Sequence, residues 1–425
     1  MRPLYGYWGV FFLRGVGNEV VLCVSTLMLV ARGLSLSEIA FILMLGFAAA
    51  TILEIPSGMA GDLWGRKRLW VLSVLCSLVW LFACLTGWKP LIALGALVNG
   101  VGVALGSGTI DALYVEWWME HFGKEHLARA GMWSTLCTYA GFAAGALLSG
   151  SLPVAWMQTV PYTLHLTVSL LLFAVMLAAG IGVVHETAAS SKTTSWKASL
   201  QEMYTQLKQT GRLTADQPML LLVLSAAVIM GFSTVGVELY WQPRLEVLSP
   251  PEQLSWMLSI CSFFSMAMLA ASGIGAAAVL ERVKTTTGKV AVYAAYRFTM
   301  IGMMACMAFI GQAPLFIFLY VLYYTAMGGQ DTVDAVLLHE AVPNSQRGTV
   351  MSVQSLALRF GGMISQALCG VLLLKIELMQ VWLLLAVIHG IGFMLCLWIF
   401  GKRRKAKADK NVKKMGEKAE NLTCP

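Results

Sequence analysis

The sequence predicts an all-α integral membrane protein in which twelve transmembrane helices form two pseudo-symmetric six-helix bundles. Its composition is the first observation: the 425 residues are 58% hydrophobic and 12% charged, with a mean hydropathy of +0.72. Soluble proteins carry about 25% charged residues. The second observation is a series of apolar runs long enough for a bilayer core, which needs about 20 residues per helix. The third is a set of short matches between the two halves of the chain.

Charges, prolines and glycine turns divide the chain into twelve apolar runs. They cover residues 4–31, 36–60, 69–88, 91–118, 127–152, 160–184, 218–245, 253–280, 288–311, 313–338, 348–374 and 378–400. The one long polar connection separates the sixth run from the seventh. We therefore expect an N-terminal bundle at 1–184, a cytoplasmic linker at 185–217, a C-terminal bundle at 218–400 and a basic tail at 401–425.

Within the linker, apolar residues recur at helical spacing between polar ones. They are Trp196, Leu200, Met203 and Leu207. This pattern predicts either an amphipathic helix on the inner membrane surface or a merely helical linker.

Basic residues are distributed unevenly across the predicted membrane. Twenty-three Lys and Arg fall on one side, together with both termini, four fall in the opposite loops and three lie within helices. Since cytoplasmic loops carry the excess of Lys and Arg, we expect a multi-pass protein of the cell membrane with both termini cytoplasmic. The net charge of +8 then reflects topology and a tail that can lie against anionic lipid, and it does not indicate nucleic acid.

Two short matches relate the halves of the chain. Thr109-Ile110-Asp111-Ala112-Leu113 recurs as Thr332-Val333-Asp334-Ala335-Val336, and Gly17-Asn18-Glu19 is echoed by Gly236-Val237-Glu238. The offsets are 223 and 219 residues. Offsets this similar indicate a duplicated six-helix unit.

The connection between the second and third runs carries a charged motif flanked by glycines. It contains Gly58, Asp62, Gly65, Arg66 and Lys67. The glycines permit a tight reversal of the chain. Asp62 can pair with Arg66 or with an opposing helix end. We expect this gating loop to act as a latch between conformations.

The order and spacing of these five residues resemble the loop signature of the major facilitator superfamily, Gly-x-x-x-Asp-x-x-Gly-Arg-Lys. Further stretches resemble its bacterial twelve-helix drug-efflux branch of proton antiporters. They are Ile55-Pro56-Ser57-Gly58, Ser107-Gly108 with Asp111-Ala112-Leu113-Tyr114, and Pro343 with Arg347-Gly348-Thr349 and Ser352. The resemblance implies the major facilitator fold, and transport by rocking two bundles about a central site.

Two departures from the efflux branch leave the direction and wiring of transport open. The antiporter signature of the fifth helix is reduced to Gly141-Phe142-Ala143-Ala144-Gly145, without its proline. The arginine that many proton-coupled relatives carry in the fourth helix is absent, and Leu97-Val98-Asn99 occupy that region.

Polar and ionisable residues inside the predicted helices are candidates for proton or substrate coupling, because each charge costs about 2.5–3.5 kcal/mol to insert. The candidates are Arg14, Asn18, Glu19, Glu54, Asp111, Glu238, Asp331, Asp334 and Arg359. Glu19 is the strongest, since it lies in a helix that lines the central cavity in the family that the chain resembles, far from any loop.

The other candidates keep two interpretations each. Glu54 and Asp111 either carry protons or belong to a charge network with Asp62 and Arg66. Arg14 and Arg359 either receive an anionic substrate or neutralise the acids. Outside this set, Arg297 either snorkels or braces its neighbours. Glu116, His339 and Glu340 are interpreted as solvated helix ends.

These features predict a proton-coupled secondary transporter that exports drugs or other small amphipathic compounds by antiport. Its expected partners are a small-molecule substrate, protons and membrane lipid, and we expect a monomer. The alternatives are an importer of a small metabolite, by symport or uniport, and a non-transporting membrane ligand sensor. No nucleotide-binding loop, metal-binding cluster or catalytic constellation occurs in the sequence, so we expect no cofactor and no enzyme activity.

Overall fold

The computed structural model of the protein describes residues 2–155, 159–184, 201, 205, 208, 210–343 and 346–420. Within these ranges the side chain of Asp62 is among those that it does not describe. Trp196, Leu200, Met203 and Leu207 of the linker lie outside the described residues, so the amphipathic helix stays a prediction.

Every described element is helical. The first half contains α1 (Arg2–Leu22), α2 (Ser25–Ala31), α3 (Leu36–Trp64), α4 (Arg66–Thr86), α5 (Lys89–Gly106), α6 (Thr109–Phe122), the short 3₁₀ helix η1 (Lys124–His126), α7 (Leu127–Ser151) and α8 (Thr163–Val183). The second half contains α10 (Pro218–Leu248), α11 (Leu254–Arg282), α12 (Thr286–Phe309), α13 (Ala313–Ala341), α14 (Arg347–Leu372) and α15 (Leu378–Glu420).

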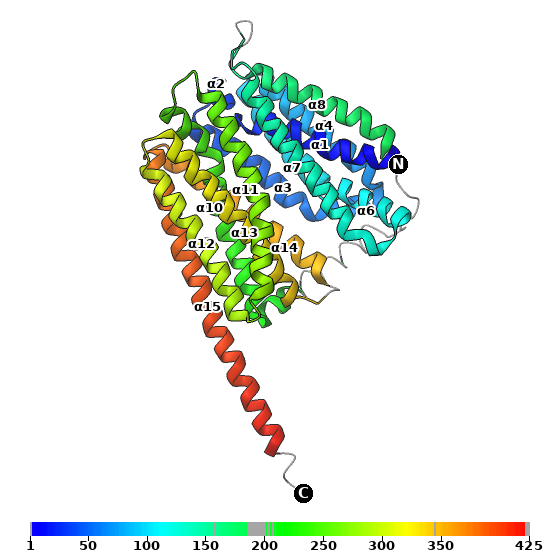
Figure 1. The fold of residues 1–425 in the computed structure, drawn as a ribbon, viewed down its shortest axis with the longest axis vertical. Helices are drawn as coiled ribbons and strands as arrows, with labels where there is room; N and C mark the ends of the chain where they lie inside the picture. Colours follow the sequence, from blue (N-terminus) through cyan, green and yellow to red (C-terminus); the bar gives the residue numbers. More distant parts are fainter. Residues whose placement is uncertain are drawn as a thin grey trace.

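Each of the twelve predicted runs corresponds to one helix or to a bent pair. By length and hydropathy alone, nine helices of the described part could cross a membrane, or ten if α1 and α2 form one bent span. The run at 4–31 breaks at Cys23 and Val24, where α1 and α2 meet at 48°. The run at 91–118 breaks at Ser107 and Gly108, and Gly108 has a φ of 67° that favours glycine. At the other end of the chain, α15 extends through most of the basic tail and projects beyond the helical body (Figure 1).

The helices pack into two lobes that meet along a few helix pairs (Figure 1). In the first lobe, α1 packs on α7 and α8, and α5 packs on α3 and α4. The second lobe repeats this arrangement: α10 packs on α14 and α15, and α13 packs on α11 and α12. Between the lobes, α3 contacts α14 and α7 contacts α11.

Glycines allow very close helix approaches. A Cβ atom added at Gly100 would lie 2.1 Å from the carbonyl oxygen of Gly46, and one added at Gly361 would lie 1.9 Å from that of Val228. At both places the neighbour is backbone, which cannot swing aside. Close backbone contact through small residues is a usual way for membrane helices to pack.

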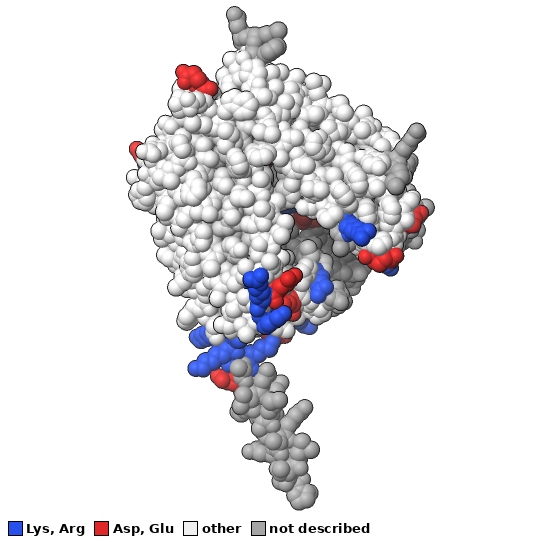
Figure 2. Space-filling model, viewed as in Figure 1, with Lys and Arg blue, Asp and Glu red and all other residues white. Residues whose placement is uncertain are grey.

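One end of the interface between the lobes is closed by hydrogen bonds. Thr26 donates to the carbonyl oxygen of Leu239 at 2.7 Å, and Ser37 donates to that of Gly370 at 2.5 Å. We call this the closed end. At the opposite end, which carries Gly65, the surface is hollowed between the lobes and charged side chains surround the hollow (Figure 2). We call this the open end.

Candidate functional site

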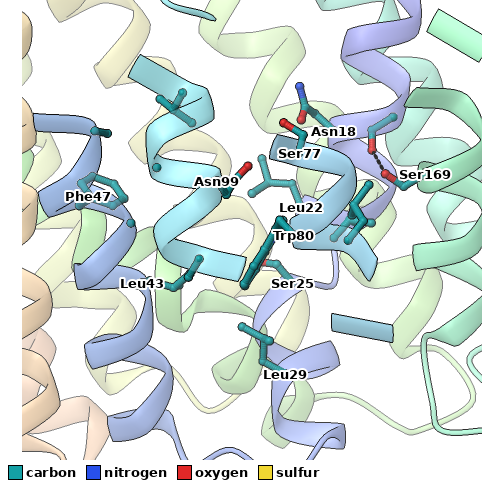
Figure 3. A pocket seen from close by; sticks show the side chains of 18 of the residues that line it. Asn18, Leu22, Ser25, Leu29, Leu43, Phe47, Ser77, Trp80, Asn99 and Ser169 are labelled. Atoms are coloured by element: carbon teal, nitrogen blue, oxygen red, sulfur yellow. Dashed lines mark hydrogen bonds between the residues drawn. The ribbon is translucent and has the colours of Figure 1, made fainter. Parts of the chain in front are cut away.

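Two cavities share lining residues of α14, and the larger of these two is built mainly by the first lobe. It has a volume of about 630 Å³, and its walls come from α1, α2, α3, α4, α5, α7, α8 and α14. Figure 3 shows Asn18, Ser77 and Asn99 around one part of this cavity, with the Trp80 ring beside them. The Asn18 and Asn99 amides form no hydrogen bond with another residue of the described chain. They therefore offer donors and acceptors to a ligand.

A second cavity of about 380 Å³ lies in the other lobe, between α10, α13 and α14. Asp331, Asp334 and His339 line it, together with Gln354. Leu358 and Arg359 of α14 line both cavities. The two cavities therefore meet at Arg359.

An ion pair beside this meeting point joins the two lobes. The Arg359 guanidinium on α14 lies 3.3 Å from the Glu54 carboxylate on α3. The Ser107 hydroxyl donates a 3.0 Å hydrogen bond to the other oxygen of Glu54. Of the two interpretations of Arg359, neutralisation of an acid matches this geometry. The side-chain partners of Glu54 here are Arg359 and Ser107.

The two acids of the repeated Thr-x-Asp-Ala motif each lie close to an arginine on another helix. Asp111 lies 4.0 Å from Arg14, and both side chains remain partly exposed. Asp334 lies 3.7 Å from Arg297, which is fully buried. The Asp334 carboxylate also accepts a hydrogen bond from Gln330 at 2.9 Å.

Arg297 braces the second lobe from within, which settles its two interpretations. Besides Asp334, it donates to the Tyr293 hydroxyl at 2.7 Å and to the carbonyl oxygen of Ala226 at 2.9 Å. Asp331, one turn from Asp334, is exposed along the second cavity and has no ion pair or hydrogen bond with another described residue.

Glu19 does not line the larger cavity, contrary to the expectation from its helix. Its neighbour Asn18 does, while the Glu19 carboxylate is buried and accepts a hydrogen bond from Ser262 of α11, in the other lobe. The reason is helical geometry: adjacent residues on a helix point about 100° apart, so only one of them faces the cavity.

Glu238, the counterpart of Glu19 in the repeat, has a different environment. It is exposed, although residues 230–243 around it are otherwise buried. Tyr324 donates a 3.2 Å hydrogen bond to its carboxylate. The repeat therefore places an acid in each lobe but does not give the two acids the same surroundings.

The predicted gating loop is shorter than its motif. Gly65 alone forms the turn between α3 and α4, with a φ of 91°, whereas Gly58 lies inside α3 and contributes no reversal. Arg66 lies 2.5 Å from Glu116 of α6, so Glu116, whose side chain is 31% exposed, is a paired helix end. Lys67 donates to the carbonyl oxygen of Ile181 at 2.8 Å.

The other two predicted helix ends are also bonded. Glu340 is exposed but pairs with Lys289, and the carbonyl oxygen of His339 accepts a hydrogen bond from Arg347. The residues that sequence reasoning did not identify are neutral partners of the charged ones, such as Ser262 and Tyr324. Their types occur throughout the helices, so no sequence signal marks them.

Comparison with known proteins places the fold. The sequence profile of the Major Facilitator Superfamily matches residues 7–295. No curated protein matches the sequence significantly.

Solved structures of transporters are similar along nearly the whole chain. The nucleoside transporter NupG is 15% identical with a TM-score of 0.75, and the alignment covers 94% of this chain and 99% of that one. A bacterial homologue of the human lysosomal transporter Spinster is 13% identical with a TM-score of 0.70, over 95% and 98% of the two chains. A D-xylose-proton symporter is 13% identical with a TM-score of 0.68, over 93% and 96%.

Proposed function

This chain belongs to the Major Facilitator Superfamily, and we propose that it is a proton-coupled secondary transporter that exports small amphipathic compounds. The two lobes are proposed to rock about the cavities, opening them to one side of the membrane at a time. The distribution of basic residues supports an open end on the cytoplasmic side. A thiol reagent that cannot cross membranes should then label Cys424, kept as the single cysteine, only after cells are opened.

The observation that carries the proposal is the mixed lining of the larger cavity. Aromatic side chains, including Phe47, Trp80 and Phe173, provide apolar surface, and the Asn18 and Asn99 amides provide hydrogen-bonding groups without protein partners. Its volume of about 630 Å³ is within the range of small-molecule sites, about 300–1,000 Å³. An amphipathic molecule can satisfy both kinds of surface at once.

Proton coupling is supported by two acids that join the lobes. A proton on Glu54 would cancel the charge with which Arg359 pairs, and a proton on Glu19 would change the carboxylate that Ser262 contacts. Both contacts link the first lobe to the second. Protonation would therefore favour one arrangement of the lobes over the other, which is what a coupled transporter requires.

Import of a small polar metabolite is the second candidate. The two free amides in the cavity favour it, because they suit the hydroxyl and ring groups of nucleosides or sugars, which two of the similar structures carry by name. A ligand sensor that does not transport is the remaining alternative. It predicts binding without flux.

Transport into inside-out vesicles separates these candidates. Vesicles energised by respiration acquire an acidic interior, and an exporter should accumulate labelled substrate in them, whereas a proton-driven importer should not. Compounds for this assay come from a growth screen of a drug-sensitive host that expresses the protein. Glu54→Gln should lose accumulation, and Glu252→Gln, at an exposed acid in the connection between α10 and α11, should keep it. Binding without accumulation in either vesicle orientation would support the sensor.

A further inference from the structure

The first apolar run, residues 4–31, forms a helix that is broken into α1 and α2, and we call the pair helix 1. No residue that usually breaks helices lies at the break. The break between α1 and α2 lies at Cys23 and Val24, and residues 18–31 contain neither proline nor glycine. Sharp kinks occur at proline, at glycine and serine pairs, at π-bulges, or where a side chain inserts into the backbone hydrogen bonds. The cause of this break therefore lies elsewhere in the structure.

The side chain of Gln242 is inserted into the backbone hydrogen bonds at the break. In an unbroken helix the Thr26 N–H would donate to the carbonyl oxygen of Leu22, four residues earlier. Here the Thr26 N–H donates to Gln242 Oε1 at 2.8 Å, and Gln242 Nε2 donates to the Leu22 oxygen at 2.7 Å. One amide thus bonds both groups that a continuous helix would join.

Gln242 belongs to the other lobe. It lies on α10, immediately before Pro243, and is 1% exposed. The same contact includes the hydrogen bond from the Thr26 hydroxyl to Leu239, also on α10. The bend of helix 1 is therefore maintained by a residue that must move away when the closed end opens.

We propose that Gln242 is a positioning residue that keeps helix 1 bent only while the closed end is shut. When α10 withdraws, the Thr26 N–H and the Leu22 oxygen lose their partners, and buried backbone groups are almost always hydrogen-bonded. They then bond to each other, and α1 and α2 straighten into one helix. Separation of the lobes and straightening of helix 1 are one event.

This exchange links the closed end to the larger cavity. Leu22, Ser25, Thr26 and Leu29 flank the break and line that cavity. Figure 3 labels three of them, Leu22, Ser25 and Leu29. Straightening moves the α2 part of the cavity wall away from the rest. The inference goes beyond the proposed function because it requires only that the closed end opens, whatever the substrate, direction or driving ion.

Distances between pairs of spin labels test the proposal without any substrate. The purified full-length protein, with its nine cysteines replaced, is labelled at exposed sites. A pair at Tyr5 and Val30 spans the bend within helix 1, and a pair at Val30 and Val247 spans the closed end. By helical rise, straightening should lengthen the Tyr5 to Val30 distance by roughly 3 Å.

Two substitutions distinguish insertion into the helix from mere strength of the interface. Gln242→Met keeps the length but has no amide, so we expect longer distances for both label pairs in a larger fraction of molecules. Thr26→Val removes the hydroxyl bond to Leu239 but keeps the backbone N–H that Gln242 accepts from. We expect it to leave the Tyr5 to Val30 distance as in the parent in every molecule whose Val30 to Val247 distance is that of the shut closed end.

Three results would overturn the proposal. They are an unchanged Tyr5 to Val30 distance in Gln242→Met, lengthening across the closed end without lengthening across the bend, and lengthening across the bend in Thr26→Val without lengthening across the closed end. If Gln242→Met does not accumulate in the membrane, Gln242→Leu replaces it, since its side chain neither accepts from Thr26 nor donates to Leu22. An unchanged bend in that variant also overturns the proposal. Since no transport is measured, failure here leaves the proposed function standing.

Discussion

At the scale of single residues, protonation of Glu19 would change a hydrogen bond between the two lobes. Glu19 belongs to α1, is buried, and accepts a hydrogen bond from Ser262 of α11. The alternative role, neutralising Arg14, does not match the geometry, because the arginine that shares its helix pairs with Asp111. A charge change at Glu19 would act on the contact between the lobes.

Glu19→Gln should abolish transport driven by a pH gradient and keep exchange of substrate down its own gradient. Glutamine can still accept the Ser262 hydrogen bond but cannot bind or release a proton. Both rates, and the amount of protein in the membrane, are measured in reconstituted liposomes. Glu252→Gln, at an exposed acid in the connection between α10 and α11, is the matched control and should keep coupling. Full pH-driven transport by a well-expressed Glu19→Gln protein would sink this role.

Exchanging the charges of Glu54 and Arg359 tests the ion pair between the lobes. Removing one member of a buried pair costs about 3–5 kcal/mol, and less here because both side chains keep some exposure. We expect Glu54→Arg and Arg359→Glu each to lose transport, and the double variant to recover at least a tenth of the parent rate. A double variant no better than either single one would show that the charges do more than pair.

The sequence identifies charged residues better than it identifies their partners. Glu54, Asp334 and Arg359 are conspicuous because charge is expensive inside a membrane. Their partners cannot be derived in the same way, since Arg359 lies some three hundred residues from Glu54 and helical spacing relates only near neighbours. The same holds for Glu116: its depth in the sequence indicates a solvated end, and only the fold brings Arg66 to it.

At the scale of helices, the turn at Gly65 joins α3 to α4, and the residue after it contacts α6. Arg66 follows the turn directly and pairs with Glu116, so movement of α4 relative to α6 must stretch or break that pair. We propose that Asp62, Arg66 and Glu116 act in gating and not in substrate binding.

Asp62→Asn and Glu116→Gln should each slow transport while leaving binding affinity and membrane abundance close to those of the parent. Each keeps the shape of its side chain and removes the charge on the carboxylate. Transport rate, ligand affinity and abundance are measured side by side, with Glu125→Gln, an exposed acid in η1, as control. Parent rates in both variants would reduce the motif to a signal for topology.

Close packing of α10 and α14 makes a second test at this scale. Gly361→Ala would place a Cβ atom 1.9 Å from the Val228 carbonyl oxygen, and such overpacking costs about 1–3 kcal/mol. We expect a lower unfolding temperature in detergent and a smaller folded fraction. Gly302→Ala in α12, with no atom within 4 Å of the added Cβ, should be neutral or slightly stabilising. Equal unfolding temperatures would contradict the packing account.

Helix limits follow from the sequence where the cause is local. Gly108, with a positive φ, breaks the fourth run, and Gly65 ends α3, because both positions favour glycine. The break of helix 1 has no local cause, since Gln242 supplies it from α10, so the sequence predicts one unbroken helix there. A glycine of the motif need not form a turn, since Gly58 lies inside α3.

At the scale of the whole molecule, the apolar runs predict the fold because each must satisfy its backbone hydrogen bonds within lipid. The short repeats between the two halves of the sequence predict the division into two lobes. Neither feature predicts which end of the molecule is closed. Closure depends on hydrogen bonds between residues far apart in the sequence, such as the one from Thr26 to Leu239. The proposed function requires that this closure alternates with closure at the Gly65 end under control of protons.

The most direct test is proton movement during transport. Inside-out vesicles with an acidic interior and a pH-sensitive dye receive compounds that the growth screen identifies as substrates. The account predicts that each compound that accumulates also drives protons out of the vesicles. Glu19→Gln vesicles with the same amount of protein should give no such release. Accumulation without proton release in the parent, or equal release in the variant, would contradict proton-coupled export by this protein.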